Sequence, residues 1–120
     1  MGSERAKRLI SIEEFIVLKR VSTRVQAESG LGLAAQQIDI DLYLNNYAEV
    51  PYKIIAEFTE VSSGSAKLLP VFDEAVELAR KTGATLLCSK IDRISRKVSV
   101  ISTLIEDKKI TLRVCLFIHI

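Results

Sequence analysis

The chain has 120 residues, of which 48% are hydrophobic and 27% are charged. This composition predicts one compact domain with a packed core, and it excludes a disordered chain, a collagen-like chain, a coiled coil and a second independent fold. Seventeen Lys and Arg residues against fifteen Asp and Glu residues leave a net charge of +2, which is too small a bias to indicate nucleic-acid binding by itself. A phosphate-binding site must therefore be argued from the positions of the arginines.

Neither the cysteines nor the apolar segments indicate secretion or a membrane. Cys88 and Cys115 each lie in an apolar run typical of a buried strand, so we expect free thiols in a reducing compartment. The longest apolar stretch, residues 110–120, is interrupted by Arg113 and His119 and has about half the length of a membrane span. Residues 1–14 form a polar, basic tail without an apolar signal core. We expect a cytoplasmic protein with no membrane partner.

The first half of the chain predicts two strands and a helix. Residues 15–18 (FIVL) are a short apolar run typical of a buried strand, and a polar loop with glycines follows over residues 22–32. Apolar residues then recur at helical spacing up to about residue 47, and they predict an amphipathic helix with this stripe on its core side: Leu31, Ala34, Ala35, Ile38 and Leu42. Residues 52–61, after Pro51, predict a second strand.

The second half predicts two further helices, each followed by a strand. One helix begins near Pro70, ends at Gly83 and carries a stripe of Phe72, Ala75, Val76 and Ala79. Residues 84–89 (ATLLCS) read as an apolar strand. A last helix over residues 97–108 has a stripe of Val98, Ile101 and Ile105, and residues 110–120 predict a fourth strand.

This β-α-β-α-β-α-β order predicts an α/β fold with three layers, in which helices cover both faces of a mainly parallel sheet of four to five strands. Ligands of such folds bind beyond the carboxyl ends of the strands. The polar segments 19–23 and 90–96 follow the first and third strands, and both contain arginine. We therefore expect the functional residues in these two segments.

Arg20, Ser22, Arg93 and Arg96 form the candidate constellation. Arginine side chains match phosphate oxygens and stabilise the charge of a phosphoryl-transfer transition state, and a serine among them is a candidate nucleophile. His119, the only histidine, lies at the far end of the last predicted strand, which disfavours a Ser-His-Asp hydrolase. Structural roles stay open: the serine as a turn former, the arginines as a solvated face, and Asp92 as a helix cap or ion-pair partner.

Three motifs in register resemble the serine recombinases, the family of resolvases, invertases and integrases. The first is R-V-S-T at residues 20–23, followed by Gln26, the S-G-L-G-L of residues 29–33, and Gln36. The second is F-T-E at residues 58–60 followed by S-G at residues 63–64, and the third is K-I-D-R-I-S-R at residues 90–96. The resemblance covers residues 15–117 and implies a recombinase catalytic domain over residues 15–120.

The resemblance implies cleavage and rejoining of double-stranded DNA without a metal or cofactor. In that family the serine, here Ser22, attacks a backbone phosphate to form a 5′-phosphoserine link and release a 3′-hydroxyl. The remaining roles carried over are phosphate binding by Arg20, Arg93 and Arg96, orientation of an arginine and help to the leaving oxygen by Asp92, and support of the site by Gln26, Gln36, Lys90 and Glu60. The family also implies a homodimer or tetramer in a full-length protein.

Two departures from the family pattern leave a second function open. The family has Arg-Pro at the start of its second helix, whereas this chain has Leu69 and Pro70, and Lys67 is the nearest candidate for the missing cation. Proteins of this family usually continue into a long helix and a DNA-binding domain, and we expect the matched region here to end before those parts. The alternative is a catalytically impaired remnant that regulates another recombinase or binds DNA. A third possibility is a flavodoxin-like or receiver-like domain that shares only the architecture.

Overall fold

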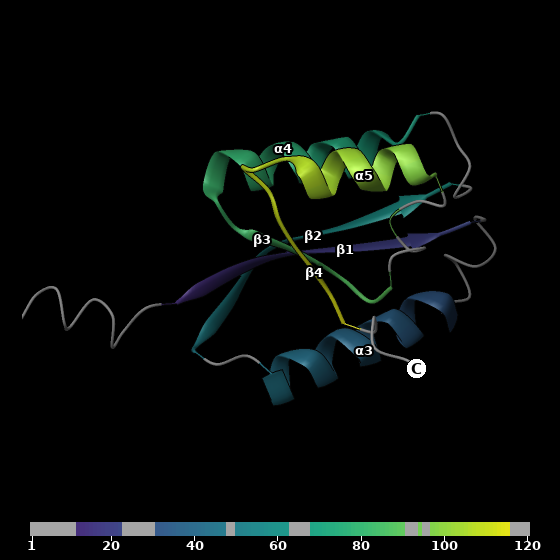
Figure 1. Ribbon diagram of the computed structural model, residues 1–120. Coiled ribbons are helices and arrows are strands. Elements are labelled where there is room, and N and C mark those ends of the chain that lie inside the picture. Colours follow the sequence, from purple (N-terminus) through teal and green to yellow (C-terminus); the bar gives the residue numbers. More distant parts are fainter. Residues whose placement is uncertain are drawn as a thin grey trace, which may run out of the picture.

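The computed structural model describes residues 12–22, 31–47, 50–62, 68–90, 94 and 97–115. Four parallel strands form one sheet in the order β2-β1-β3-β4. Helices α4 (Pro70–Thr82) and α5 (Val98–Glu106) cover one face of this sheet, and α3 (Leu31–Tyr47) covers the other (Figure 1). The three-layer α/β fold with a parallel sheet is therefore confirmed, with four strands among the described residues.

The four strands span the following residues: β1 Glu13–Val21, β2 Tyr52–Val61, β3 Thr85–Cys88 and β4 Thr111–Val114. The central strands β1 and β3 are buried on both faces, which explains why they read as continuous apolar runs, whereas the outer strands β2 and β4 are partly exposed. Along β1, Phe15 and Val17 pack on the α3 side, whereas Ile16 and Leu18 pack on the α4 side. Strand β1 runs three residues past the apolar run, because its pairing with β2 continues to Val21.

Helix α4 (Pro70–Thr82) has the boundaries and the buried face that its sequence predicts. Its buried residues are Phe72, Ala75, Val76 and Ala79, which is the whole predicted stripe. Pro70 occupies the first turn, where its missing N–H costs no hydrogen bond. Gly83 ends the helix at φ 76°, a left-handed conformation that favours glycine, and its N–H donates to the Ala79 carbonyl at 2.9 Å.

Helix α3 (Leu31–Tyr47) forms where it was predicted, but its predicted core side is wrong. Ile40 and Leu44 pack into the core with Phe15, Val17 and Leu87. The predicted inward residues Ala34, Ala35, Ile38 and Leu42 are instead exposed. The helix has apolar residues on both sides, so helical spacing alone does not select the side that meets the sheet.

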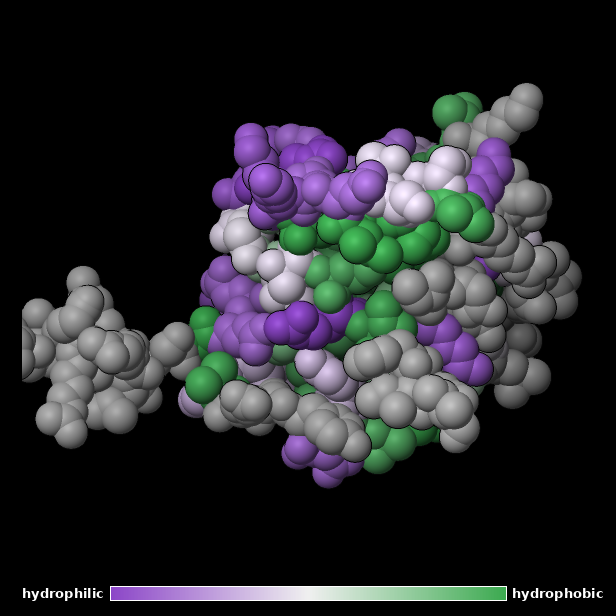
Figure 2. All heavy atoms as spheres, viewed as in Figure 1, coloured by the Kyte–Doolittle hydropathy of each residue, from purple (hydrophilic) through white to green (hydrophobic). Residues whose placement is uncertain are grey.

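The last two elements also differ from their predictions. Helix α5 (Val98–Glu106) buries Leu104, whereas Val98 and Ile105 of the predicted stripe are 78% and 61% exposed. Figure 2 shows hydrophobic residues at the surface on the face that carries α5. Strand β4 ends at Val114, six residues before the predicted end, and residues 116–120 lie outside the described part of the chain.

Candidate functional site

Ser22 lies at the carboxyl edge of the sheet, directly after the last residue of β1, and is exposed. Strands β1 and β2 are in register there, with Arg20 opposite Glu60 and Val21 opposite Val61. The ladder continues one step further, because the Ser62 N–H donates to the Val21 carbonyl at 2.9 Å. The two neighbouring strands thus bring Ser22 beside Ser62, although forty positions separate them in sequence.

Arg20 is the predicted site residue nearest to Ser22 in the chain, and only 2% of its surface is exposed. Its Nη1 atom donates to the Ser62 carbonyl oxygen at 2.8 Å. A buried guanidinium that bonds the end of the neighbouring strand ties the two strand ends together. Arg20 therefore holds a fixed positive charge under the edge where Ser22 lies.

Gln36 completes the backbone hydrogen bonding of β1 at Arg20. The Arg20 N–H donates to Gln36 Oε1 at 3.2 Å, and Gln36 Nε2 donates to the Arg20 carbonyl at 2.9 Å and to the Gly32 carbonyl at 3.2 Å. The last paired residues of β1 and β3 are Val17 and Leu87, so β3 does not pair with β1 as far along as Arg20. The buried amide of Gln36 takes the place of a neighbouring strand and fixes the backbone two residues before Ser22.

Glu60 is a buried carboxylate that caps helix α4. Its Oε1 atom accepts hydrogen bonds from the Val71 and Phe72 N–H groups, at 2.9 and 3.0 Å. These N–H groups lie in the first turn of the helix, where they have no acceptor within the helix and where the helix dipole favours a negative charge. Glu60 therefore joins the end of β2 to the start of α4, and it occupies the anion-binding end of this helix.

The third predicted segment is only partly described. Lys90 is exposed two residues after the end of β3. Ile94 is 2% exposed and belongs to the core on the α4 side, so the segment after β3 is anchored to the domain at this point. Five predicted site residues lie outside the described residues: Gln26, Lys67, Asp92, Arg93 and Arg96.

Leu69 occupies the position where the family pattern has an arginine, and it is a core residue here. Its side chain is 5% exposed and belongs to the same cluster as Phe72 and Leu18. The neighbouring Leu68 is 81% exposed. The side chain of residue 69 therefore contributes packing at the start of α4 and no hydrogen-bond donor.

The described residues offer little for metal or thiol chemistry. No group of three or more His, Cys, Asp or Glu residues in this part of the chain is arranged to hold a metal ion. The predicted free thiols are confirmed for Cys88, which is buried, and Cys115, which is half-buried. Burial, and secondly the charge of Asp39, raises the pKa of Cys115 to about 12, so this thiol stays protonated at neutral pH. Within the described ranges, no helix has the length and hydrophobicity to cross a membrane.

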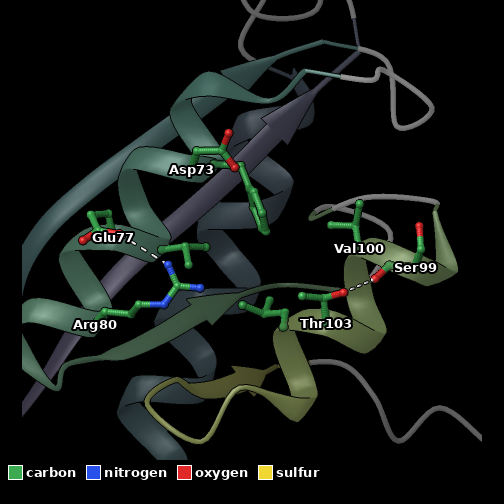
Figure 3. A pocket seen from close by; sticks show the side chains of 9 residues that line it. Asp73, Glu77, Arg80, Ser99, Val100 and Thr103 are labelled. Carbon is green, nitrogen blue, oxygen red and sulfur yellow. Dashed lines mark hydrogen bonds and ion pairs between the residues drawn. The ribbon is translucent and has the colours of Figure 1, made fainter.

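A groove of about 450 Å³ opens between α4 and α5, and none of the predicted site residues lines it (Figure 3). Asp73 and Glu77 line its α4 side, and Arg80 at its end is bonded to Asp107 at 2.8 Å and to Glu77 at 3.3 Å. Carboxylates repel a phosphate, and the guanidinium already has two carboxylate partners. This groove is therefore a poor site for DNA phosphate, and the candidate site stays at the strand ends.

Sequence reasoning missed two features of the site. It did not identify the Ser62 carbonyl as the anchor of Arg20, because a backbone acceptor has no signature in the sequence. It assigned Gln36 and Glu60 to the site only through the family resemblance, without their contacts. The one local signal is their polarity: amides and carboxylates are rarely buried unless they have hydrogen-bond partners.

The sequence of the chain matches one known protein family. Residues 15–117 match the family described as "Resolvase, N terminal domain". No curated protein sequence matches the chain.

Several solved structures share the fold. The N-terminal catalytic domain of TP901-1 integrase is similar with a TM-score of 0.70 and 24% identity, over 86% of this chain and 78% of that one. The C-terminal catalytic domain of ISC1926 TnpA, an IS607-like serine recombinase, gives 0.67 and 19%, over 85% and 70%. A resolvase family site-specific recombinase from Streptococcus pneumoniae gives 0.61 and 24%, over 86% and 72%.

These structures establish the same fold, and the family match covers residues 15–117, the range that contains all three motifs. The chain belongs to the resolvase N-terminal domain family, the catalytic domains of serine recombinases.

Proposed function

We propose that this chain is the catalytic domain of a site-specific DNA recombinase and that Ser22 is its nucleophile. Ser22 Oγ attacks a backbone phosphorus, the P–O3′ bond breaks, and the 5′-phosphoserine link conserves the bond energy for rejoining. The hydroxyl proton of Ser22 leaves to a carboxylate or to water, and the 3′-oxygen takes up a proton from an acid or from water as it leaves, which gives the 3′-hydroxyl. The observation that carries this proposal is the exposed Ser22 at a strand end that the buried Arg20 and Gln36 hold in place.

The arginines supply the charge for this reaction. Arg20 acts from inside the domain, where a fixed cation stabilises a developing negative charge without reorganisation. We propose that Arg93 and Arg96 contact the scissile phosphate, that Asp92 orients one of them, and that Lys90 adds to the positive field. Gln26 and Lys67 complete the proposed DNA-binding set. Double-stranded DNA is the proposed substrate, and self-association as a dimer or tetramer is expected when the domain belongs to a longer protein.

A second candidate function follows from Leu69. Loss of a donor from a preorganised phosphate site typically costs about 3 kcal/mol of transition-state stabilisation. Because Leu69 is a 5% exposed core residue, this site lacks that donor in the described residues. The alternative function is therefore a regulatory module that binds DNA or another recombinase and cleaves DNA slowly or not at all.

Covalent capture distinguishes the two functions. The chain, alone and joined to the DNA-binding region of a related recombinase, is incubated with nicked duplex carrying that relative's cognate site. Mass spectrometry then locates any nucleotide adduct on the peptide that contains Ser22. We expect an adduct that Ser22→Ala abolishes. Ser62→Ala is the matched control: Ser62 lies beside Ser22 at the end of β2, and its contacts with Val21 and Arg20 use the backbone, so this variant should keep the adduct. An adduct that survives Ser22→Ala refutes the nucleophile assignment.

Absence of an adduct from a fusion that still binds its DNA supports the regulatory function. A restored arginine then tests whether the missing donor is the cause. Leu69→Arg is unsuited to this test, because it forces a cation into the core and destabilises the domain. Leu68→Arg places the guanidinium one residue away at an 81% exposed position, where folding is preserved. Cleavage gained by Leu68→Arg identifies the lost donor as the defect.

A further inference from the structure

Helix α3 has two apolar faces, and the described part of the chain covers only one of them. Ile40 and Leu44 face the sheet and are buried. On the opposite side, Ile38 and Leu42 are 59% and 54% exposed. Figure 1 shows α3 alone on its side of the sheet, with no other described helix or strand against its outer face. Exposed hydrophobic residues are common singly, but here two large ones share one helix face.

The spacing on the outer face is that of a helix-pairing seam. Exposed residues recur at intervals of three, four and three positions: Ala35, Ile38, Leu42 and Asn45. This is the alternation of a and d positions in a heptad, which places successive side chains along one straight line for a neighbouring helix. The small side chain of Ala35 lets another helix approach closely at one end, and Ile38 and Leu42 supply the apolar contact. The surface is therefore shaped for a helix rather than for an extended strand.

The charge of α3 limits what that helix can be. The helix contains Asp39 and Asp41, one on each side of the seam, and no Lys or Arg. Asp41 is exposed and accepts a hydrogen bond from Gln37 Nε2 at 2.8 Å, which leaves its negative charge in place. Glu57 and Lys19 form an ion pair at 3.8 Å on the sheet side of α3, so they add no net charge there. The charged side chains of α3 itself are thus both negative, and they flank the outer face that a partner would meet.

We propose that the outer face of α3, defined by Ala35, Ile38, Leu42 and Asn45, binds a helix of another protein that carries an apolar seam flanked by Lys or Arg. Basic residues at the flanking positions pair with Asp39 and Asp41, whereas acidic ones are repelled. A second copy of α3 fits poorly, because two such helices bring four carboxylates together and supply no cation. This surface lies on the opposite face of the sheet from α4, so it is independent of the groove between α4 and α5.

Two synthetic helices serve as probes. Each has about three heptads with Leu at the a and d positions; one has Lys at the e and g positions and its twin has Glu there. Fluorescence anisotropy at neutral pH gives the affinities, and methyl NMR signals of Ile38 and Leu42 report the location. We expect the Lys peptide to bind at least about tenfold more tightly than the Glu peptide, and to bind less tightly as salt is added.

Variants on two helices decide whether α3 is the site. Ile38→Asp should weaken the Lys peptide by about tenfold or more, whereas Ile105→Asp on α5 should leave its affinity unchanged. The two isoleucines are 59% and 61% exposed, so neither substitution disturbs the core. Replacing both Asp39 and Asp41 with Asn should remove the preference for the Lys peptide. Three results would each overturn the proposal. The first is equal affinity for the Lys and Glu peptides, and the second is an equal loss of Lys-peptide affinity in Ile38→Asp and Ile105→Asp. The third is a dimer of the chain that Ile38→Asp dissociates.

Discussion

The substitution Gln36→Leu tests the role of a buried amide beside the proposed nucleophile. Gln36 is 1% exposed and exchanges two hydrogen bonds with the backbone of Arg20. Its amide also donates to the Gly32 carbonyl, and leucine, which has a similar size, makes none of these three hydrogen bonds. The change therefore removes the hydrogen bonds while keeping most of the packing.

The expected cost follows from the groups that lose this partner. The N–H and the carbonyl of Arg20 each lose Gln36, at about 1–3 kcal/mol per buried group. The burial of a leucine side chain recovers about 1–2 kcal/mol. We therefore expect the free energy of unfolding to fall by about 3 kcal/mol, which for a domain of this size lowers Tm by about 10 °C.

Urea unfolding followed by circular dichroism measures this loss, with Gln37→Leu as the matched control. Gln37 is the next residue of α3; its amide accepts a hydrogen bond from the half-buried Lys19 and donates one to the exposed Asp41. We expect its loss to cost less than about 1 kcal/mol, because Asp41 is exposed and Lys19 keeps the Glu57 carboxylate at 3.8 Å. If Gln36→Leu lowers the free energy of unfolding no more than Gln37→Leu does, with an unchanged dependence on urea concentration, the buried amide does not stabilise the end of β1 as argued.

Three further predictions concern other contacts of the fold. Glu60→Gln keeps an oxygen for the α4 cap but removes the charge at the helix terminus, so it should cost about 1 kcal/mol in urea unfolding; no loss would contradict the capping role. Gly83→Ala should cost about 1 kcal/mol through its φ of 76° alone, because no atom lies within 4 Å of the added methyl; an unchanged thermal midpoint would argue against strain. The Lys109 N–H, and secondly Arg80, lowers the pKa of Asp107 below 3.8, so its stabilisation is complete above pH 3.8 and is lost as pH falls through the lower folded pKa. Asp107→Asn should flatten that acid dependence in a pH series of urea titrations, and an identical profile would contradict it.

Helices α3 and α4 show how far sequence alone determined the packing. The stripe of α4 was predicted residue for residue, because its opposite side is polar and only one face can be buried. In α3, Ile38 and Leu42 compete with Ile40 and Leu44 for the core, and local spacing does not distinguish them. The choice was made by the tertiary structure, since only one orientation places Gln36 against the unpaired edge of β1 at Arg20.

The site shows the same division. The sequence by itself determined the α/β architecture, the sheet edge at which Ser22 lies and, through three motifs in register, the family. Only the tertiary structure decided that Arg20 bonds the Ser62 carbonyl, that Glu60 caps α4 and that Leu69 belongs to the core. The physical reason is that these contacts join residues from different elements: the pairing register of β1 and β2 sets the first, and the packing of α4 on the sheet sets the other two. Local propensity predicts the elements, but it does not contain that register.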